Sequence, residues 1–452
     1  MSDGIEQKLN SWSEQYLVGC LLLGLVALTW TGVGSAASVG SVGLALCVIG
    51  LAQSTARVDL PALGALTVYC LLGLVSAYAS YGGIDGTYPS NHLIFPAVYL
   101  LTACLDRDML VSLRRLCAVW AGVVAAAGIF TFALRAAVLR SSGRLGGFLG
   151  NPNAMGIFLV LGWFAVLGCE SDGRKIDLSF IEPILLAAMG LTLSMGSFLS
   201  MAVGIAVLLI GKARSESLRA AVLYGLELLS RASLGVGTGL LLYLAATRTG
   251  YPACGLLVLA YGAGVAAAWK KLLLFLRQSR RAVGLLTAAG VLVAAAAILS
   301  RPSAASTFAE RLEMMGSALA YLRENPLLGV GPYRWRGLDQ ANGGTFFNTW
   351  HIHNMFLHVG AELGLAAMCA LLAAAFRLWK TRKGASRAGF SAFLMHNLID
   401  TSFFYPVILL LEIMAAGAPP EKGRTVKGVL LKLLFGGFAL VFAYDLFRYY
   451  TA

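Results

Sequence analysis

Charged residues are scarce in this chain of 452 residues, and their scarcity excludes an ordinary soluble domain. Asp, Glu, Lys and Arg make up 13% of the sequence, against about 25% in typical soluble domains, and 58% of the residues are hydrophobic. The mean hydropathy of +0.76 is correspondingly high. This composition indicates a polytopic membrane protein.

Clustered cysteines, internal repeats and low-complexity tracts are also missing from the sequence. The 8 cysteines stand singly, mostly inside apolar runs, with no C-x-x-C pair and no cluster with histidines. This distribution excludes a disulfide framework and a cysteine–histidine metal motif, so we interpret the cysteines as packing residues. No repeat period points to a repeat architecture.

Acidic residues are outnumbered by basic ones, 22 to 35, which gives a formal net charge of +13. Most of the basic residues lie in short loops between apolar runs, near residues 107–115, 174–175, 212–219, 270–281, 380–387 and 422–427. Such loops set topology and contact anionic headgroups, so we expect membrane lipids as partners and no nucleic acid. These loops share one side of the predicted topology, which the positive-inside rule assigns to the cytoplasm.

Apolar runs of about 15 to 25 residues recur from Tyr16 to Tyr444. Unpaired backbone groups cannot be satisfied in lipid, so the runs predict an all-α fold with about 12 to 15 membrane segments. We expect one integral membrane domain over residues 1–452, with an extracytoplasmic loop at 301–351 and a first run retained as a span. The predicted segments are 15–33, 35–53, 60–80, 91–105, 114–138, 152–169, 180–195, 197–212, 219–247, 251–269, 283–300, 352–379, 387–402, 404–418 and 426–447.

Two of these predictions leave alternatives open. Segment 219–247 is long enough for an interfacial helix followed by a span, and the pair between 387 and 418 is short enough to be re-entrant. The topology also places a set of arginines on the outer side, against the positive-inside rule. Such a set needs either an anion or a fold to explain it. Its members are Arg135, Arg140, Arg144, Arg301, Arg311, Arg323, Arg334 and Arg336.

The stretch "RLGGFLGNPNAMG" at 144–156 has the features of a helix start that binds an anion. Asn151 is a favourable N-cap and Pro152 suits the first helical position. Glycines before them allow close backbone approach, and the helix dipole with Arg144 favours a negative group. The alternative is a capped helix start whose arginine reaches lipid headgroups.

The outer loop opens with "STFAERLEMMGSALAYLRENP" at 306–326. Thr307 and Glu310 have capping-box spacing, which predicts a helix start there. The apolar stripe formed by Phe308, Leu312, Met315, Leu319 and Leu322 predicts an amphipathic helix on the outer surface. Arg311 falls in its first turn, where the alternative to an anion contact is a solvated or intramolecular ion pair.

The stretch "TWHIHNMFLHVGAELGL" at 349–365 places His353 and Asn354 at the start of a membrane segment. The helix dipole disfavours imidazolium there, so a neutral His353 is suited to accept a proton. The alternative is a histidine that hydrogen bonds headgroups or backbone, and His351 and His358 are weaker candidates. Glu362 lies further in, where an unpaired carboxylate is costly, so we expect it to have a partner.

The stretch "HNLIDTSFFYP" at 396–406 places His396 and Asp400 one helical turn apart. They form either an orienting pair or a polar lock between helices, and we favour the lock.

In order and spacing, these motifs resemble the O-antigen ligase and polymerase superfamily of bacterial membrane glycosyltransferases. The resemblance covers roughly residues 60–420 and rests on "RLGGFLGNPN", "ERLEMMGSALAYLRENPLLGVGP", "HNMFLHVGAELGL" and "HNLIDTSFFYP". It implies a GT-C-like architecture in the bacterial cytoplasmic membrane, with the active site on the outer face. It also implies inverting, metal-independent and cofactor-free transfer of a glycan from an undecaprenyl-pyrophosphate carrier to an acceptor hydroxyl on a glycan, lipid or protein.

The resemblance gives the candidate residues their roles. His353 takes the proton of the acceptor hydroxyl and Arg311 acts on the leaving pyrophosphate. The donor pyrophosphate is bound by Arg144, Asn151, Asn153 and Arg140, and support comes from Asn354, Glu362, His396 and Asp400.

One departure from the family pattern concerns "LSMGSF" at 193–198, where Met195 stands at a position that is arginine in many members. Arg140, Arg135 or Arg334 are the candidates to compensate. Polymerase and ligase remain equally open.

Two other function classes also remain open. The first is a transporter or lipid-linked glycan flippase, for which Glu227 and Arg231, four residues apart in an uncertain span, are the best sequence argument. The second is a non-catalytic assembly protein, which would leave the arginines and His353 free to vary.

Overall fold

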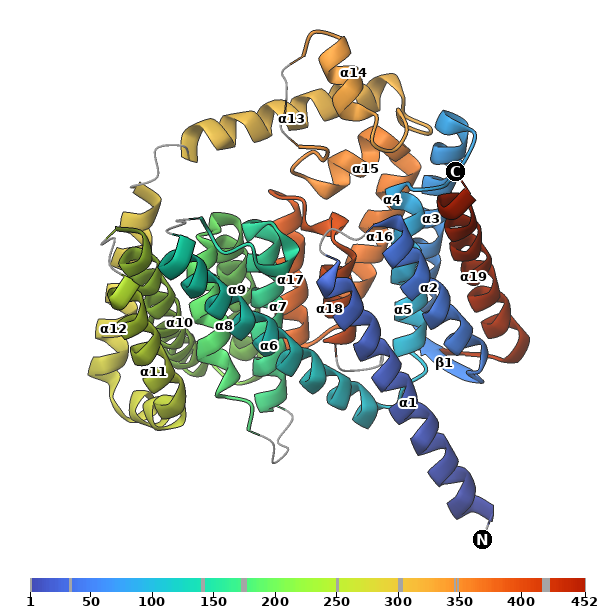
Figure 1. The fold of residues 1–452 in the computed structure, drawn as a ribbon. Coiled ribbons are helices and arrows are strands. Elements are labelled where there is room, and N and C mark those ends of the chain that lie inside the picture. The colour runs from blue at the N-terminus through green and yellow to red at the C-terminus, as the bar shows by residue number, and fades with distance from the viewer. Residues whose placement is uncertain are drawn as a thin grey trace. The chain divides into compact units, whose positions relative to one another are not determined.

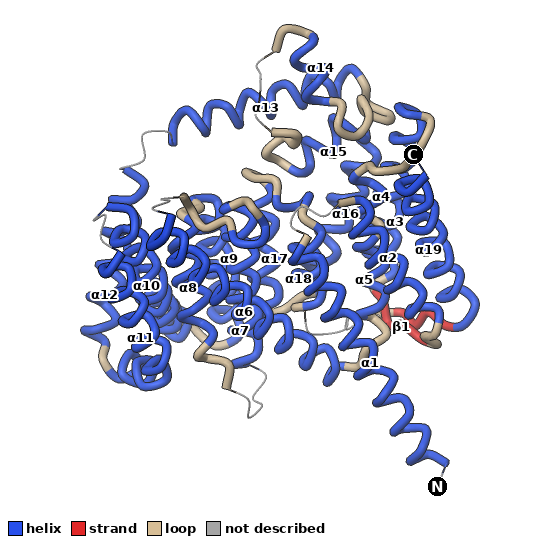
Figure 2. Tube along the Cα trace, in the orientation of Figure 1, coloured by secondary structure: helices blue, strands red, loops and turns tan. Residues whose placement is uncertain are grey.

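A computed structural model of the chain describes residues 2–31, 35–139, 143–171, 177–248, 252–299, 304–344, 347, 349–416 and 423–451. Almost all of this part of the chain is helical, as Figures 1 and 2 show. The exception among the described residues is a pair of four-residue strands, β1 (Thr55–Val58) and β2 (Arg424–Lys427), paired antiparallel with Thr55 opposite Lys427. The predicted all-α membrane fold is confirmed.

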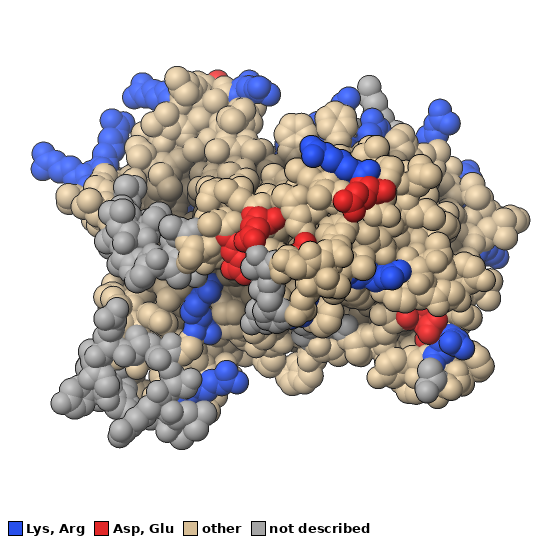
Figure 3. Space-filling model, turned by 90° about the horizontal axis from the view of Figure 1, so that it is seen from above, with Lys and Arg blue, Asp and Glu red and all other residues tan. Residues whose placement is uncertain are grey.

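Eight helices in the described residues are long and apolar enough to cross a membrane, and Ala36–Leu51 and Ile181–Thr192 are shorter apolar helices. These eight helices are fewer than the 12 to 15 predicted membrane segments, because several of the predicted segments form short or broken helices. Charged side chains are sparse on the face shown in Figure 3. The eight are Ser13–Trp30, Leu60–Tyr81, Arg107–Ala136, Pro152–Ser171, Met195–Ser215, Leu218–Ala246, Leu259–Gln278 and Gly428–Thr451.

The chain forms two compact units, each built from separate stretches of sequence. Unit 1 consists of Met1–Leu113, Thr307–Arg382 and Asn397–Ala452, and unit 2 of Arg114–Ser306 and Lys383–His396.

Unit 1 contains two closely packed helix pairs, α2 with α19 and α3 with α16. Asp59 supports the second pair. Its carboxylate caps α3 by accepting the Ala62 N–H at 2.9 Å, and it accepts two hydrogen bonds from the guanidinium of Arg377 on α16, at 2.7 and 3.3 Å. Its helices are α1 (Ser2–Trp30), α2 (Ala36–Leu51), α3 (Leu60–Tyr81), α4 (Tyr88–His92), α5 (Ile94–Thr102), α13 (Ala304–Glu324), α14 (Trp335–Ala341), α15 (Met355–Leu363), α16 (Leu365–Thr381), η2 (Ser402–Phe404), α18 (Pro406–Met414) and α19 (Gly428–Thr451).

Unit 2 is centred on α8 and α10, which approach each other closely through small residues. A Cβ on Gly239 would lie 2.0 Å from the Ala187 carbonyl oxygen, so only glycine fits there. Segment 219–247 is one continuous helix rather than an interfacial helix plus a span. The helices are most of α6 (Arg107–Leu139), η1 (Gly147–Leu149), α7 (Pro152–Ser171), α8 (Ile181–Thr192), α9 (Met195–Ser215), α10 (Leu218–Arg248), α11 (Pro252–Gln278), α12 (Arg280–Leu299) and α17 (Gly384–Asn397).

A buried ion cluster ties four helices of unit 2 together. Arg231 on α10 donates to Glu182 on α8 at 2.6 and 3.0 Å, and both side chains are fully buried. The indole N–H groups of Trp163 on α7 and Trp269 on α11 each donate to the same carboxylate at 2.8 Å. Burial of this charge is tolerated because every oxygen of Glu182 is satisfied.

The same cluster accounts for the charges that favoured a transporter. Arg231 also donates to Glu170 at 2.6 Å, and Glu227 lies 3.7 Å from Arg231 and 3.1 Å from Arg277. Glu227 and Arg231 therefore have partners within unit 2 and need no transported ligand to explain them.

Candidate functional site

The first candidate site lies in unit 1, where the turn-rich stretch after α13 docks on a break between α15 and α16. The N–H groups of Val330 and Gly331 donate to the carbonyls of Ala361 and Glu362, each at 2.9 Å. The Leu365 N–H donates to the Pro326 carbonyl at 2.8 Å. The turn thus satisfies backbone groups that a helix break leaves unpaired.

Gly364 is the residue that breaks the predicted segment 352–379 into two helices. Its φ is +90°, and an added Cβ would lie 2.2 Å from the Leu327 carbonyl oxygen. A side chain fits neither the conformation nor the space. The sequence gives a continuous apolar pattern here, so the break was not predicted.

Helix α13 is amphipathic as predicted, but its start and its buried face differ from the prediction. It begins at Ala304, so Thr307 lies inside the helix and does not cap it. The residues that pack on the unit 1 core are Met314, Ala318 and Tyr321, with Met315 partly buried beside them. The predicted stripe instead contains exposed side chains, those of Phe308, Leu312 and Leu319.

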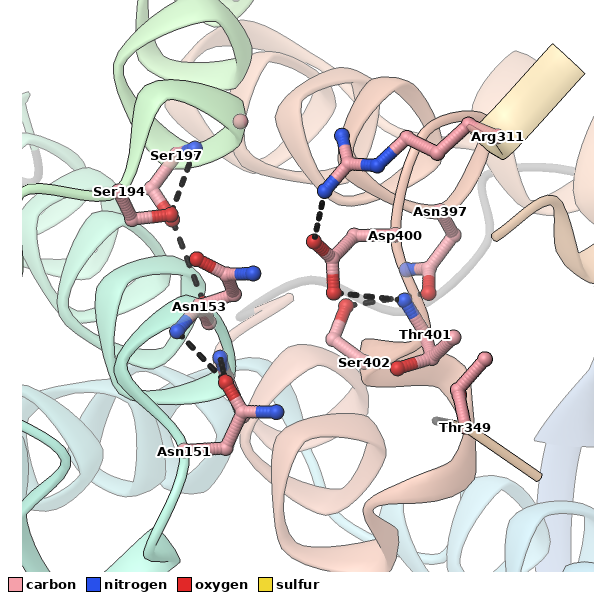
Figure 4. Close-up of polar contacts among 12 residues, drawn as sticks. Asn151, Asn153, Ser194, Ser197, Arg311, Thr349, Asn397, Asp400, Thr401 and Ser402 are labelled. Atoms are coloured by element: carbon pink, nitrogen blue, oxygen red, sulfur yellow. Dashed lines mark hydrogen bonds and ion pairs between the residues drawn. The ribbon is translucent and has the colours of Figure 1, made fainter. Parts of the chain in front are cut away.

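Arg311 on α13 forms an ion pair with Asp400 (Figure 4). Its Nη2 lies 3.2 Å from the Asp400 carboxylate, and the side chains are 20% and 3% exposed. The Nε of Arg311 is buried without a hydrogen-bond partner among the described residues. The guanidinium therefore keeps donors that Asp400 does not use.

The turn that presents Asp400 is held by an asparagine that the sequence analysis did not single out. The Asn397 side-chain oxygen accepts hydrogen bonds from the Ser402 hydroxyl at 3.0 Å and the Phe403 N–H at 2.5 Å (Figure 4). Asp400 also accepts the Thr401 N–H at 2.8 Å. Asn and Asp favour turns because their side chains bond the backbone that follows, and "HNLIDTS" contains both residues.

The prediction that His396 and Asp400 stand one helical turn apart is wrong. Helix α17 ends at Asn397, and Leu398–Asp400 form a turn because Asn397 turns its side chain onto the backbone that follows. Asp400 contacts Arg311 on α13. His396 itself is fully buried on α17.

His353 immediately precedes α15, as predicted, and Asn354 caps that helix. The Asn354 side-chain oxygen accepts the N–H groups of Phe356 and Leu357, both at 3.1 Å. Its amide donates to the Leu398 carbonyl at 3.4 Å, which joins the helix start to the Asp400 turn. Asn354 thus fixes the backbone beside His353.

The imidazole of His353 is held in its neutral form by its surroundings. Burial lowers its pKa below the ordinary histidine value and Arg311 lowers it further, against opposing contributions from Asp400 and Glu310. Its Nδ1 is buried without a hydrogen-bond partner among the described residues. A neutral imidazole with an unused ring nitrogen is equipped to accept a proton.

Glu362 has the partners that the sequence analysis required of it. One carboxylate oxygen accepts the Tyr333 N–H at 2.8 Å and lies 3.1 Å from His358 Nε2, and the other accepts the Trp335 N–H at 3.1 Å. The carboxylate thereby anchors the turn at 333–335 to α15. This arrangement makes Glu362 a structural support.

The second candidate site, in unit 2, contains Arg144, Asn151 and Asn153. Asn151 caps α7 as predicted, accepting the N–H groups of Asn153 at 2.8 Å and Ala154 at 3.4 Å (Figure 4). Arg144 donates to the Thr192 carbonyl at 2.7 Å and to the Asn153 side chain at 2.8 Å. These contacts hold the partly exposed guanidinium next to the α7 N-terminus.

A second helix begins beside α7 in the same unit. Ser194 caps α9 through the Ser197 N–H at 3.3 Å, and the Ser197 hydroxyl donates to the Asn153 carbonyl at 3.3 Å (Figure 4). Met195, at the position of the family arginine, is the first residue of α9. Two helix N-termini and Arg144 favour negative charge here.

The candidates to compensate for Met195 are placed as follows. Arg140 lies outside the described residues, as does Arg301, a member of the outer set of arginines but not one of these candidates. Arg135 is exposed on α6, and Arg334 is exposed with its guanidinium 5.9 Å from the centre of the Tyr81 ring.

Among the residues that the structure describes, no three His, Cys, Asp or Glu side chains gather as ligands for a metal ion.

Comparison with known proteins finds a family that part of the chain is similar to. No curated protein sequence matched the chain. Residues 232–372 match the family model described as O-antigen ligase. The matched segment contains Arg311, His353 and Glu362, whereas Arg144 and Asp400 lie outside it. Over residues 232–372 the chain is thus similar to the O-antigen ligase family, which supports the resemblance found in the sequence.

Proposed function

We propose that this membrane protein transfers a glycan from an undecaprenyl-pyrophosphate carrier to an acceptor hydroxyl on a glycan, lipid or protein. The transfer is inverting and metal-independent, and it takes place at the outer face of the bacterial cytoplasmic membrane. The observation that carries the proposal is the group formed by His353, Arg311 and Asp400 in a chain with an O-antigen ligase match.

In the proposed reaction, His353 is the general base. Its neutral imidazole takes the proton of the acceptor hydroxyl while that oxygen attacks the anomeric carbon of the donor. The bond from the anomeric carbon to the pyrophosphate oxygen breaks, and the electron pair leaves with the pyrophosphate. Attack opposite to the leaving group inverts the anomeric configuration.

Arg311 is the group that we assign to the leaving pyrophosphate. Asp400 fixes one of its nitrogens at 3.2 Å, which leaves other N–H donors of the fork for phosphate oxygens. The negative charge of Asp400 also raises the pKa of His353 against the effect of burial, so it stabilises the imidazolium that forms. Asp400 is a positioning residue in this scheme.

Arg144 is a second candidate for a phosphate contact on the strength of its own surroundings. It is fixed by the Thr192 carbonyl and Asn153 beside the N-termini of α7 and α9, where a negative group is favoured. Asn151 and Asn153 organise this position. The proposal keeps Arg140 as a further candidate from the sequence alone.

The proposal is tested with purified protein in detergent, given lipid-pyrophosphate-linked oligosaccharide extracted from its own host. Micelles do not separate two compartments, so a transporter or flippase yields no new product, whereas a transferase forms longer glycans or a new glycoconjugate. Arg311→Ala is expected to abolish the product. Arg323→Ala, an exposed arginine on the same helix, is the matched control and is expected to keep it. Absence of product from the wild type with its genuine donor and acceptors overturns the proposal.

A further inference from the structure

His358 and Glu362 form a fully buried pair on α15, one helical turn apart. His358 takes no part in the proposed transfer, and its position in the sequence makes it a weaker candidate for a base than His353. A titratable pair that is withdrawn from solvent is costly unless its contacts compensate. The contacts of this pair lead to His353 on one side and to α13, the helix that carries Arg311, on the other.

The hydrogen bond to His358 defines its tautomer. The N–H of Ile352 donates to His358 Nδ1 at 3.2 Å, so Nδ1 carries no proton. In the neutral ring the proton is then on Nε2, which lies 3.1 Å from the Glu362 carboxylate. Nε2 makes no hydrogen bond among the described residues, so the carboxylate favours this tautomer through its negative charge, and the Ile352 N–H fixes it by its hydrogen bond to Nδ1.

Ile352 is the residue immediately before His353. Its side chain is fully buried in the unit 1 core, and its N–H is held by His358. On the other side, Asn354 caps α15. The backbone of His353 is thus fixed from both of its neighbours, by His358 and by the helix cap.

Glu362 extends the same network towards α13. Its carboxylate accepts the N–H of Tyr333, which has a left-handed φ of +61°, an unfavourable conformation for a residue with a side chain. It also accepts the N–H of Trp335, whose indole donates to the Ser317 hydroxyl on α13 at 3.0 Å. Arg311 is carried by that helix.

We propose that His358, oriented by Glu362, is a positioning residue that holds the backbone of His353 in register with the helix that carries Arg311. This inference rests on the proposed function. His358 contacts no reacting atom. It acts through the Ile352 N–H, and Glu362 supplies the fixed tautomer and the link to α13.

The kinetic test compares two replacements of His358 with the wild type. His358→Phe keeps a ring but removes the acceptor for the Ile352 N–H, and kcat is expected to fall about 10- to 100-fold with little change in the donor KM. His358→Asn places an oxygen near the position of Nδ1, so we expect it to recover part of kcat. A structural role alone would not distinguish these two variants by kcat at similar thermal stability.

The outcomes separate this inference from the proposed function. If the wild type forms product and His353→Ala does not, full kcat in His358→Phe overturns the positioning role. A rise in donor KM with unchanged kcat overturns it as well. If His358→Phe fails to fold, His358→Asn takes its place, and a fall of kcat to the level of His353→Ala overturns the inference.

A second test needs no glycan transfer and so stands if the proposed function fails. The chain has only 5 histidines, so 15N-labelled imidazole signals of the full-length protein in detergent are few. The signal that disappears in His358→Asn is expected to show a proton on Nε2 and none on Nδ1. A proton on Nδ1 of that ring overturns the inference.

Discussion

The buried pair of Arg231 and Glu182 predicts a large loss of stability when one partner is removed. Arg231→Met leaves the Glu182 carboxylate fully buried without its cation, although two indole N–H groups still bind it. Breaking such a pair costs about 3–5 kcal/mol. Glu182→Gln keeps the shape and an acceptor, and leaves Arg231 paired with Glu170, so we expect about 1–3 kcal/mol.

The double variant Arg231→Met with Glu182→Gln is the decisive comparison. It leaves no fully buried charge in the pair, and Glu170 is 31% exposed and can be hydrated. It is therefore expected to be more stable than Arg231→Met alone in a thermal-unfolding or denaturant series in detergent. We also expect it to retain glycan transfer, since the cluster is structural. The reasoning would be refuted if Arg231→Met were as stable as the wild type. It would also be refuted if the double variant lost more unfolding free energy than the two single variants lose together.

Three further predictions concern unit 1. In the wild type, the transfer rate is expected to fall with acidity only below the ordinary histidine pKa, because burial lowers the pKa of His353 and the neutral form is active. Asp400→Asn removes a charge that raises this pKa. A pH profile of kcat for that variant should therefore show the fall at lower pH, and a lower rate on the plateau. Asn354→Ala removes a helix cap worth about 1 kcal/mol and should lower both the unfolding midpoint and kcat, whereas Asn354→Asp, which keeps the acceptor, should retain stability. Gly364→Ala forces a side chain into a φ of +90° and against the Leu327 carbonyl, so thermal unfolding should show a marked loss of stability, and an unchanged midpoint would contradict the account of the helix break.

Local signals in the sequence predicted the starts of the helices that present the candidate residues. Asn151 caps α7, and Asn354 caps α15. The cap at Asn151 and the helix start at His353 and Asn354 were predicted, whereas the capping role of Asn354 was not, although a cap depends only on a side chain and the N–H groups two or three residues later. The requirement of a partner for Glu362 was also correct, since it follows from the cost of burying a charge.

Contacts between distant parts of the sequence were not predictable in this way. Arg311 and Asp400 are 89 residues apart, and neither position indicates the other. The helix break at Gly364 depends on the backbone of Leu327, which approaches only in the folded chain. The buried face of α13 also differs from the apolar stripe, because large apolar residues such as Phe308 stand on the exposed face of this helix as well.

The central claim is glycan transfer with His353 as the base, and one measurement addresses it directly. The rate of product formation from the host lipid-pyrophosphate donor is compared between wild type and His353→Ala, each with and without a metal chelator. The account predicts a wild-type rate that resists the chelator and falls about 10²- to 10⁴-fold in His353→Ala, the usual contribution of a general base. A wild-type rate abolished by the chelator, or an undiminished rate in His353→Ala, would contradict it.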